Sequence, residues 1–317
     1  MSVYIAHRLF AAHDRALAAD LADRLAAKVG PDRVFLPFCD TGEEDLVAEV
    51  KGRRLFELDR ERLSRLGAMI AILHGPSLDD GVCMEIGYAA ASGIPVVVLT
   101  TDFQTYSMTE AGTHLEFPDP LLQAAATRIV RVDSLGTPPL PPAPGRSRFQ
   151  DFQTRNVVQT NTALDAAVDT LLTLPDHARL PACPPGTIGT PVYVEASPYT
   201  AWGQDQLAKA CVNAGHTVMA PQRFTAPDPV AGALADLTAV RSAARLLVDV
   251  SGPETPPGTA LLIGAALASG VRIAAFQPRM TFTHAHGREP NWRNLMIQYA
   301  ADAHLDNGES VLSWLAT

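Results

Sequence analysis

The chain has 317 residues, 47% of them hydrophobic, and a formal net charge of −9. This is enough apolar material for one large or two ordinary domains. An acidic chain without a basic stripe argues against a nucleic-acid or anionic-membrane partner. No run reaches the ~18 apolar residues of a transmembrane helix, the first residues do not read as a signal peptide, and the four cysteines form no CxxC pair. We therefore expect a cytoplasmic protein with reduced thiols.

Strand and helix patterns alternate through the first half of the chain. Apolar strand patterns cover residues 2–6, 33–38, 68–75 and 94–100. Apolar residues at helical spacing cover residues 11–30, 46–67, 81–93 and 147–174. Near-continuous apolar strands that alternate with helices predict a parallel sheet covered by helices on both faces.

The same order restarts after a Pro- and Gly-rich break at residues 175–190. Strand patterns cover residues 190–196, 216–221, 244–252 and 271–276, and helical patterns cover residues 199–215, 228–243 and 258–270. We therefore predict an α/β fold of two tandem flavodoxin- or Rossmann-like units that form an internal pseudo-dimer. The predicted domains are a first unit at 1–176, a linker at 177–190 and a second unit at 191–317.

One helix is nearly repeated. Between residues 81–93 and 258–270, seven of thirteen positions are identical, and these are mostly Gly and Ala positions that allow close packing. The acidic residues of the first copy are not repeated: Asp79, Asp80 and Glu85 correspond to Pro256, Pro257 and Leu262. Maintenance of the fold would not need carboxylates in one copy only, so we predict that the first copy carries chemistry.

Glu85 is the strongest candidate for that chemistry. It lies near the start of a helix that follows a strand, and open α/β sheets bind ligands at the carboxyl ends of their strands. The helix N-terminus is expected to keep the carboxylate ionised and therefore nucleophilic. Asp59 precedes the same strand, and carboxylates gathered at one cleft suit glycosyl transfer. A plain helix-start charge for Glu85 and a solvated helix face for Asp59 stay open as alternatives.

Three stretches resemble the nucleoside 2-deoxyribosyltransferases. They are "VYIAHRLF" at 3–10, Asp59, and "DDGVCMEIGYAAASGIPVVV" at 79–98. The pattern of that family is a Tyr in the first strand, an upstream Asp, and then Asp-x-Gly-x-x-x-Glu-x-Gly-x-Ala. Both predicted units show the framework of this pattern.

The resemblance implies an enzyme that moves 2-deoxyribose between nucleobases in nucleoside salvage. Glu85 would be the nucleophile that forms a covalent 2-deoxyribosyl ester, and two displacements would retain the configuration at C1′. Asp79 would handle the base and its proton, Asp59 would do likewise or bind the sugar, and Tyr4 would orient Glu85. No metal or redox cofactor is implied.

The family also completes each site from a neighbouring subunit, through an Asn-Leu-Met segment. The second copy contains this segment at residues 294–296, whereas we assign its counterpart in the first copy to "QTRNVVQT", with Asn156. We therefore predict one composite active site per chain and an inactive reciprocal site around Tyr193, Asp236 and Leu262. The predicted substrate-binding residues are Asn294, Met296, Phe10, Arg8 and Gly81.

One departure from the family keeps other functions open. His7 and Arg8 add bulk and positive charge where a 5′ substituent would lie, which keeps a nucleotide N-glycosidase as an alternative. A nucleoside N-glycosidase and a non-catalytic nucleoside-binding protein are further alternatives. The predicted partners are 2′-deoxynucleosides and free nucleobases, and homo-oligomerisation is left open.

Overall fold

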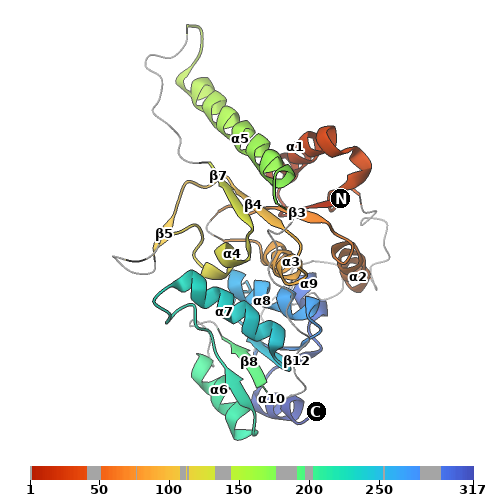
Figure 1. The fold of residues 1–317 in the computed structure, drawn as a ribbon, viewed down its shortest axis with the longest axis vertical. Helices are drawn as coiled ribbons and strands as arrows, with labels where there is room; N and C mark the ends of the chain where they lie inside the picture. Colours follow the sequence, from red (N-terminus) through yellow and green to blue (C-terminus); the bar gives the residue numbers. More distant parts are fainter. Residues whose placement is uncertain are drawn as a thin grey trace.

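A computed structural model shows two parallel sheets with a double layer of helices between them (Figure 1). It describes residues 2–40, 51–75, 77–107, 112, 114–132, 144–175, 191–196, 203–252, 254–278 and 294–317. The predicted linker at 177–190 lies outside this part of the chain, so the domain boundaries stay predictions. Among the described residues, none of the helices combines the length and the apolar character needed to cross a membrane.

The first sheet has five parallel strands in the order β2-β1-β3-β4-β7. Its strands are β1 (Val3–Ala6), β2 (Val34–Phe35), β3 (Ala68–Ile72), β4 (Val96–Thr100) and β7 (Arg128–Arg131). β1 pairs with β3 so that Tyr4 lies opposite Met69. This order is of the flavodoxin type, and its connections reverse direction between β1 and β3, where such sheets bind ligands.

The second sheet repeats this order as β9-β8-β10-β11-β12. Its strands are β8 (Pro191–Glu195), β9 (Thr217–Met219), β10 (Arg245–Asp249), β11 (Arg272–Phe276) and β12 (Ala303–Leu305). A two-stranded antiparallel pair, β5 (Tyr106–Ser107) with β6 (His114–Leu115), lies beside the first sheet. The predicted α/β class with two parallel-sheet units is confirmed.

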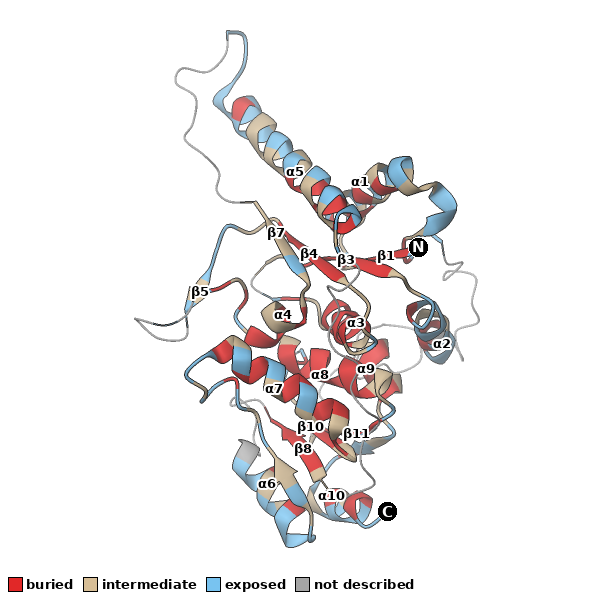
Figure 2. Cartoon of the chain, viewed as in Figure 1, coloured by how far each residue is buried: buried red, intermediate tan, exposed pale blue. Residues whose placement is uncertain are grey.

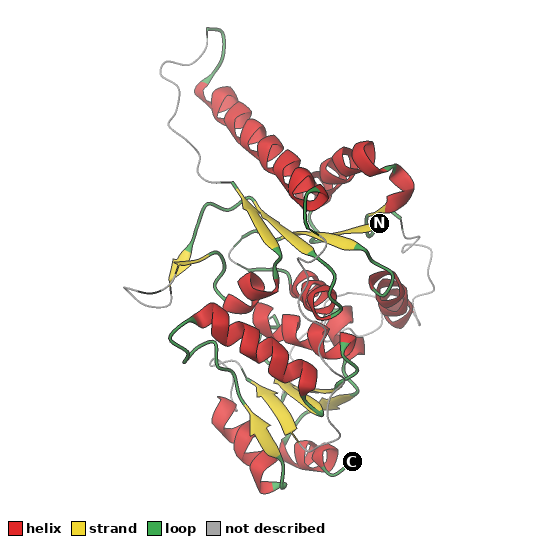
Figure 3. Cartoon of the chain, in the orientation of Figure 1, coloured by secondary structure: helices red, strands yellow, loops and turns green. Residues whose placement is uncertain are grey.

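The helices divide into outer and inner layers (Figure 3). The outer helices are α1 (Ala12–Val29) and α5 (Arg148–Leu172) on the first sheet, and α6 (Gly203–Asn213) and α10 (Gly308–Leu315) on the second. The inner helices are α2 (Lys51–Leu63), α3 (Asp80–Ala91) and α4 (Pro120–Ala125) from the first unit, and α7 (Pro229–Ser242), α8 (Pro257–Ala268) and α9 (Leu295–Ala300) from the second. A single 3₁₀ turn, Pro31–Arg33, leads into β2.

The inner helices bury one hydrophobic cluster that spans both units, and two smaller clusters lie under the outer helices. Helices α3 and α8 lie at the centre of the cluster that spans both units, and most of their surface is buried (Figure 2). Their apolar composition on nearly all faces is typical of helices enclosed in a core.

Two glycines allow α3 and α8 to approach backbone to backbone. A Cβ placed on Gly87 would lie 1.9 Å from the carbonyl oxygen of Leu261, and a Cβ on Gly264 would lie 1.9 Å from that of Met84. The two glycines are 177 residues apart, as are Met84 and Leu261, and this is the offset of the sequence repeat. The contact therefore follows the pseudo-two-fold symmetry. The predicted internal pseudo-dimer is confirmed at this contact.

A buried ion-pair cluster also joins the units. The side chain of Arg223, which is 1% exposed, lies 2.5 Å from Glu195, 3.2 Å from Asp236 and 3.1 Å from Asp119 of the first unit. A buried guanidinium is tolerated when carboxylates surround it, and removal of such a partner leaves uncompensated charge.

Several short elements were missing from the sequence prediction. They are β5, β6, α4, β7, α9, β12 and α10. The expected helix at 46–67 is described from Lys51 to Leu63, and the expected strand at 33–38 shortens to Val34–Phe35. These elements have two to eight residues and carry too little periodicity to be recognised in a single sequence.

We expect Gly87→Ala and Gly264→Ala each to lower the free energy of unfolding by about 1–3 kcal/mol, because the added methyl group overpacks a backbone contact. Urea unfolding of the two variants measures this loss, and the pseudo-symmetry predicts similar values. Ser92→Ala, at the exposed end of α3, is the control and is expected to stay within about 0.5 kcal/mol of the parent. An unchanged unfolding midpoint in both glycine variants would contradict this view of the interface.

We expect Arg223→Met to lower the free energy of unfolding by about 3–5 kcal/mol at neutral pH, because it leaves the buried carboxyl groups of Glu195 and Asp236 and the partly buried one of Asp119 without their cation. Burial already raises the pKa of Glu195 in the parent, while Arg223 lowers it. Loss of Arg223 raises that pKa further, so the destabilisation grows as the pH rises and shrinks in acid. Unfolding at two pH values measures the trend, with the exposed Arg128→Met as control. An equal loss at both pH values would contradict it.

Candidate active site

The candidate site lies where β1 and β3 end and α3 begins. Asp79 caps α3, and its Oδ1 accepts a hydrogen bond of 2.9 Å from the backbone N–H of Val82. The cap directs the first turn of α3 over the carboxyl edge of the sheet. The sequence folds this way because an Asp before a helix satisfies an otherwise unpaired N–H group.

Glu85 lies in the second turn of α3 and faces the first strand. The hydroxyl group of Tyr4 donates a hydrogen bond of 2.7 Å to Oε1 of Glu85, and both side chains are buried. A phenol that donates to one carboxylate oxygen fixes the orientation of the carboxyl group and leaves the other oxygen for a reaction partner. The structure thus brings together the predicted nucleophile and the residue predicted to orient it.

The prediction that the helix start keeps Glu85 ionised is wrong in its net effect. Burial raises the pKa of Glu85 well above its usual range, and the nearby Asp59 and Asp79 raise it further, while the Tyr4 hydrogen bond opposes them. The field of the helix fades after the first turn, and Glu85 lies beyond that turn. Desolvation and like charges therefore decide its protonation.

Asp59 and Asp79 complete a group of three carboxyl groups. Asp59 is partly buried on α2, close enough to Glu85 to influence its pKa. Burial also raises the pKa of Asp79, and hydrogen bonding from Val82 and the charge of Arg8 counteract this shift. The raised pKa values of Glu85 and Asp79 suit these carboxyl groups to hold and exchange a proton at a higher pH than an ordinary carboxyl group does.

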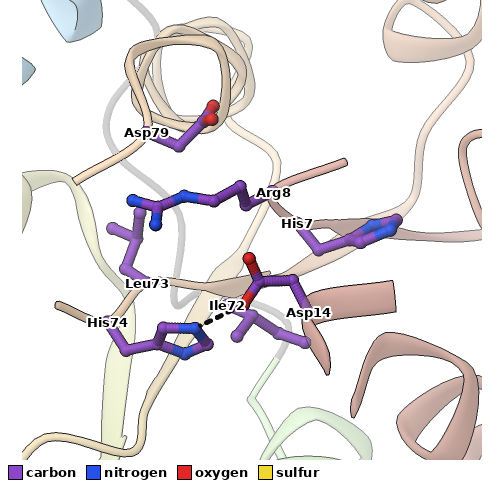
Figure 4. Close-up of a pocket in the computed structure, with 7 residues that line it drawn as sticks. All are labelled: His7, Arg8, Asp14, Ile72, Leu73, His74 and Asp79. Carbon is purple, nitrogen blue, oxygen red and sulfur yellow. Dashed lines mark hydrogen bonds and ion pairs between the residues drawn. The ribbon is translucent and has the colours of Figure 1, made fainter. Parts of the chain in front are cut away.

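A small pocket opens beside Asp79. It is lined by His7, Arg8, Asp14, Ile72, Leu73, His74 and Asp79. Arg8 extends between Asp79 and the hydrogen-bonded pair formed by His74 Nε2 and Asp14 Oδ1, which are 2.8 Å apart (Figure 4). The Arg8 guanidinium donates to the carbonyl oxygen of Ser77.

The second unit reaches this site through the start of α9. Asn294 caps α9, with its Oδ1 accepting a hydrogen bond of 3.0 Å from the backbone N–H of Met296. Its Nδ2 lies against Gly81, where a Cβ would come within 2.7 Å. The structure therefore places Asn294 beside the first turn of α3, as the sequence predicted. The side chain of Met296 is buried in the shared core.

The counterpart of Asn294 was wrongly assigned to Asn156. Asn156 lies within α5, on the outer face of the first sheet, and its side chain bonds to the helix carbonyl of Phe152. The structural counterpart is Asp119, which caps the equivalent inner helix α4 and lies against Gly258 as Asn294 lies against Gly81. An Asp-Pro helix start was the available signal for this residue.

The reciprocal site around Tyr193, Asp236 and Leu262 is occupied by side chains of the protein itself. Tyr193 and Leu262 occupy the positions that Tyr4 and Glu85 have in the first unit, and both are fully buried. The Arg223 guanidinium lies among the carboxyl groups of Glu195, Asp236 and Asp119. Sequence reasoning missed Arg223, because its partners come from three distant segments of the chain.

Phe10 does not join the other predicted residues. Its side chain is 82% exposed, beyond the end of β1, and it is absent from the pocket lining described above. Its role in substrate binding stays a prediction. Asp80, which sequence reasoning noted only as one of the acidic residues missing from the second copy, lies at the start of α3 beside Asp79. His74 and Asp14, which the sequence did not single out, line the pocket.

Solved structures offer partial likenesses. A conserved protein from Enterococcus faecalis V583 is 33% identical over 32% of this chain and 64% of its own length, with a TM-score of 0.29. The 2-deoxyribosyltransferase of Bacillus psychrosaccharolyticus and the 2-desoxiribosyltransferase of Leishmania mexicana are each 18% identical over 39% of this chain and 95% of theirs, with TM-scores of 0.32. This chain thus spans under two thirds of the Enterococcus protein.

The family comparison concerns the first unit. No curated protein matches the chain. The model of the family described as nucleoside 2-deoxyribosyltransferase matches residues 3–138, which include Tyr4, Asp59, Asp79 and Glu85. The kinship of the second unit stays a prediction, because the match ends before it. Residues 3–138 are thus similar to the nucleoside 2-deoxyribosyltransferase family, the same family that the sequence pattern resembles.

Proposed function

We propose that the protein transfers 2-deoxyribose from one nucleobase to another through an ester on Glu85, in nucleoside salvage. The observation that carries this proposal is the buried hydrogen bond of 2.7 Å from Tyr4 to Glu85, inside a domain of the matching family. A carboxylate oriented by a phenol and flanked by two further carboxyl groups is suited to attack an anomeric carbon.

In the first step, an oxygen of ionised Glu85 attacks C1′ of the deoxynucleoside. The glycosidic C–N bond breaks, its electron pair leaves with the base, and Asp79 supplies a proton to that base. The raised pKa of Asp79 supports this role, because an acid must be protonated when the base departs. The products of the step are a free base and a deoxyribosyl ester.

In the second step, a nitrogen of the incoming base attacks C1′ of the ester. The C–O bond to Glu85 breaks, the carboxylate is restored, and the proton of the incoming base passes to Asp79. Two displacements at one carbon retain its configuration. Asn294 is proposed to bind the sugar from the second unit, so that both units build one site.

The surroundings of Arg8 support a nucleoside rather than a nucleotide substrate. Arg8 is the one arginine in the lining of the described pocket, and it already faces Asp79 and donates to Ser77. Burial lowers the pKa of His7. Asp80 and Glu254 add further negative charge near Asp79. A phosphate dianion in this setting would meet repulsion from several carboxyl groups.

We expect Glu85→Gln to lose base exchange by about 10³-fold or more, because the amide cannot form the ester. The protein is mixed with 2′-deoxyinosine and free adenine, and nucleosides and bases are followed by chromatography. The matched control is Leu262→Met at the equivalent position of the second unit, which is expected to retain exchange because the swap conserves volume.

The products of the parent protein discriminate among the functions. 2′-Deoxyadenosine supports the transferase. Hypoxanthine and free sugar without 2′-deoxyadenosine would show an N-glycosidase, and 5′-monophosphates would then test the nucleotide form. If the protein binds the nucleoside but forms no product, it is a nucleoside-binding protein and not an enzyme.

We expect Tyr4→Phe to move the acid limb of the kcat/KM profile to higher pH. The Tyr4 hydrogen bond lowers the pKa of Glu85, so its loss raises that pKa, and ionised Glu85 then becomes abundant only at higher pH. At pH values below this limb, the loss of the hydrogen bond to the charged Glu85 is expected to lower kcat/KM by roughly 10- to 100-fold. The control Tyr193→Phe changes the equivalent tyrosine of the second unit. An unmoved limb in Tyr4→Phe would contradict the role of Glu85 as the titrating nucleophile.

A further inference from the structure

We propose that Asp80 is a positioning residue that holds the side-chain amide of Asn294 over the first turn of α3, and so connects the second unit to the site in the first. The effect of this positioning on catalysis rests on the proposed deoxyribosyl transfer. The contact itself does not depend on that function and is tested separately below.

The two ends of the Asn294 amide have different partners. Its Oδ1 accepts the hydrogen bond of 3.0 Å from Met296 N–H and caps α9. Asn294 also lies close enough to Asp80 that a hydrogen bond between the two side chains lowers the pKa of Asp80. Since Oδ1 serves the cap, Nδ2 donates to the Asp80 carboxylate, and the two bonds together fix the orientation of the amide.

Gly81 makes this contact sterically possible. A side chain at position 81 would lie 2.7 Å from Nδ2 and 3.4 Å from the amide carbon of Asn294. The glycine therefore leaves space for the amide directly beside the residue that binds it. Glycine, carboxylate and amide form one contact between the units, made of α3 and the cap of α9.

The charges around Asp80 make the contact sensitive to protonation. Burial and the Asp79 carboxylate raise the pKa of Asp80 to about 7, Glu254 raises it too, and the hydrogen bonds from Asn294 and Gly81 oppose this shift. Glu254 comes from the second unit and accepts a hydrogen bond from Ser77, while Arg8 acts on the adjacent Asp79. An ionised carboxylate accepts more strongly than a neutral carboxyl group, so the contact strengthens as the pH rises through about 7.

The reciprocal site shows that the contact belongs to one side of the pseudo-dimer. There, Pro257 replaces Asp80 and the carboxylate of Asp119 replaces the amide of Asn294. Asp119 pairs instead with Arg223 at 3.1 Å. The pairing of carboxylate and amide is thus found beside Glu85, and the equivalent surface beside Leu262 lacks both partners.

The contact is tested by NMR of the full chain with ¹⁵N-labelled asparagine. The side-chain amide signal of Asn294 is assigned by its loss in Asn294→Asp and followed from acid to alkaline pH. We expect it to titrate with a midpoint near the pKa of Asp80, about 7, and to stop titrating in Asp80→Asn, which preserves shape. Glu254→Gln is the matched control. It removes a neighbouring negative charge, so the signal should still titrate but with a lower midpoint.

Activity supplies the second readout, with base exchange as the assay. We expect Asp80→Ala to lower kcat/KM by about tenfold, as for loss of one charge-assisted hydrogen bond, and Asn294→Ala to add little to Asp80→Ala because the two residues act as one unit. Asp80→Asn should flatten the dependence of kcat/KM on pH around 7.

The two readouts separate the possible failures. If the amide titrates as expected but the parent shows no base exchange, the contact stands and the proposed function fails. If the Asn294 signal is the same in the parent and in Asp80→Asn across the pH range, the positioning role of Asp80 is overturned. Fully additive losses in the double variant would also overturn it.

Discussion

The close approach of α3 and α8 determines where everything else in the molecule lies. Gly87 and Gly264 let each helix backbone contact the other, and this distance sets how far apart the two sheets are. It also brings the cap of α9 onto the first turn of α3, where Asn294 contacts Gly81. A larger residue at either glycine would separate the units and with them the two parts of the site.

The two sides of this frame have diverged in charge rather than in fold. On one side, Tyr4, Glu85 and the acidic start of α3 meet a neutral amide from the other unit, which leaves carboxyl groups with raised pKa values. On the other side, Arg223 compensates the buried carboxyl groups and fills the space. One arrangement keeps reactive groups incompletely paired, as catalysis requires, while the other pairs them for stability.

The two-unit fold and the acidic residues of the candidate site could be predicted from the sequence. The offset of 177 residues, together with the alternating strands and helices, was sufficient for the two-unit fold. The grouping of Glu85, Asp79 and Asp59 rested in addition on the resemblance to the family. The placement of Asn294 beside α3 came from the resemblance of residues 294–296 to the Asn-Leu-Met segment of that family. The counterpart Asp119 was missed because α4 has six residues and no clear periodicity. The protonation of Glu85 was misjudged because burial, which a sequence does not display, outweighs the helix field.

The central claim is that Glu85 carries the sugar between two bases. The most direct test is mass spectrometry of the intact protein and its peptides after incubation with a slow 2′-fluorinated deoxynucleoside, which prolongs the life of a glycosyl ester. The account predicts one sugar adduct per chain, located on the peptide that contains Glu85 and absent in Glu85→Gln. Base exchange by the parent protein without an adduct, or an adduct on another residue, would contradict it.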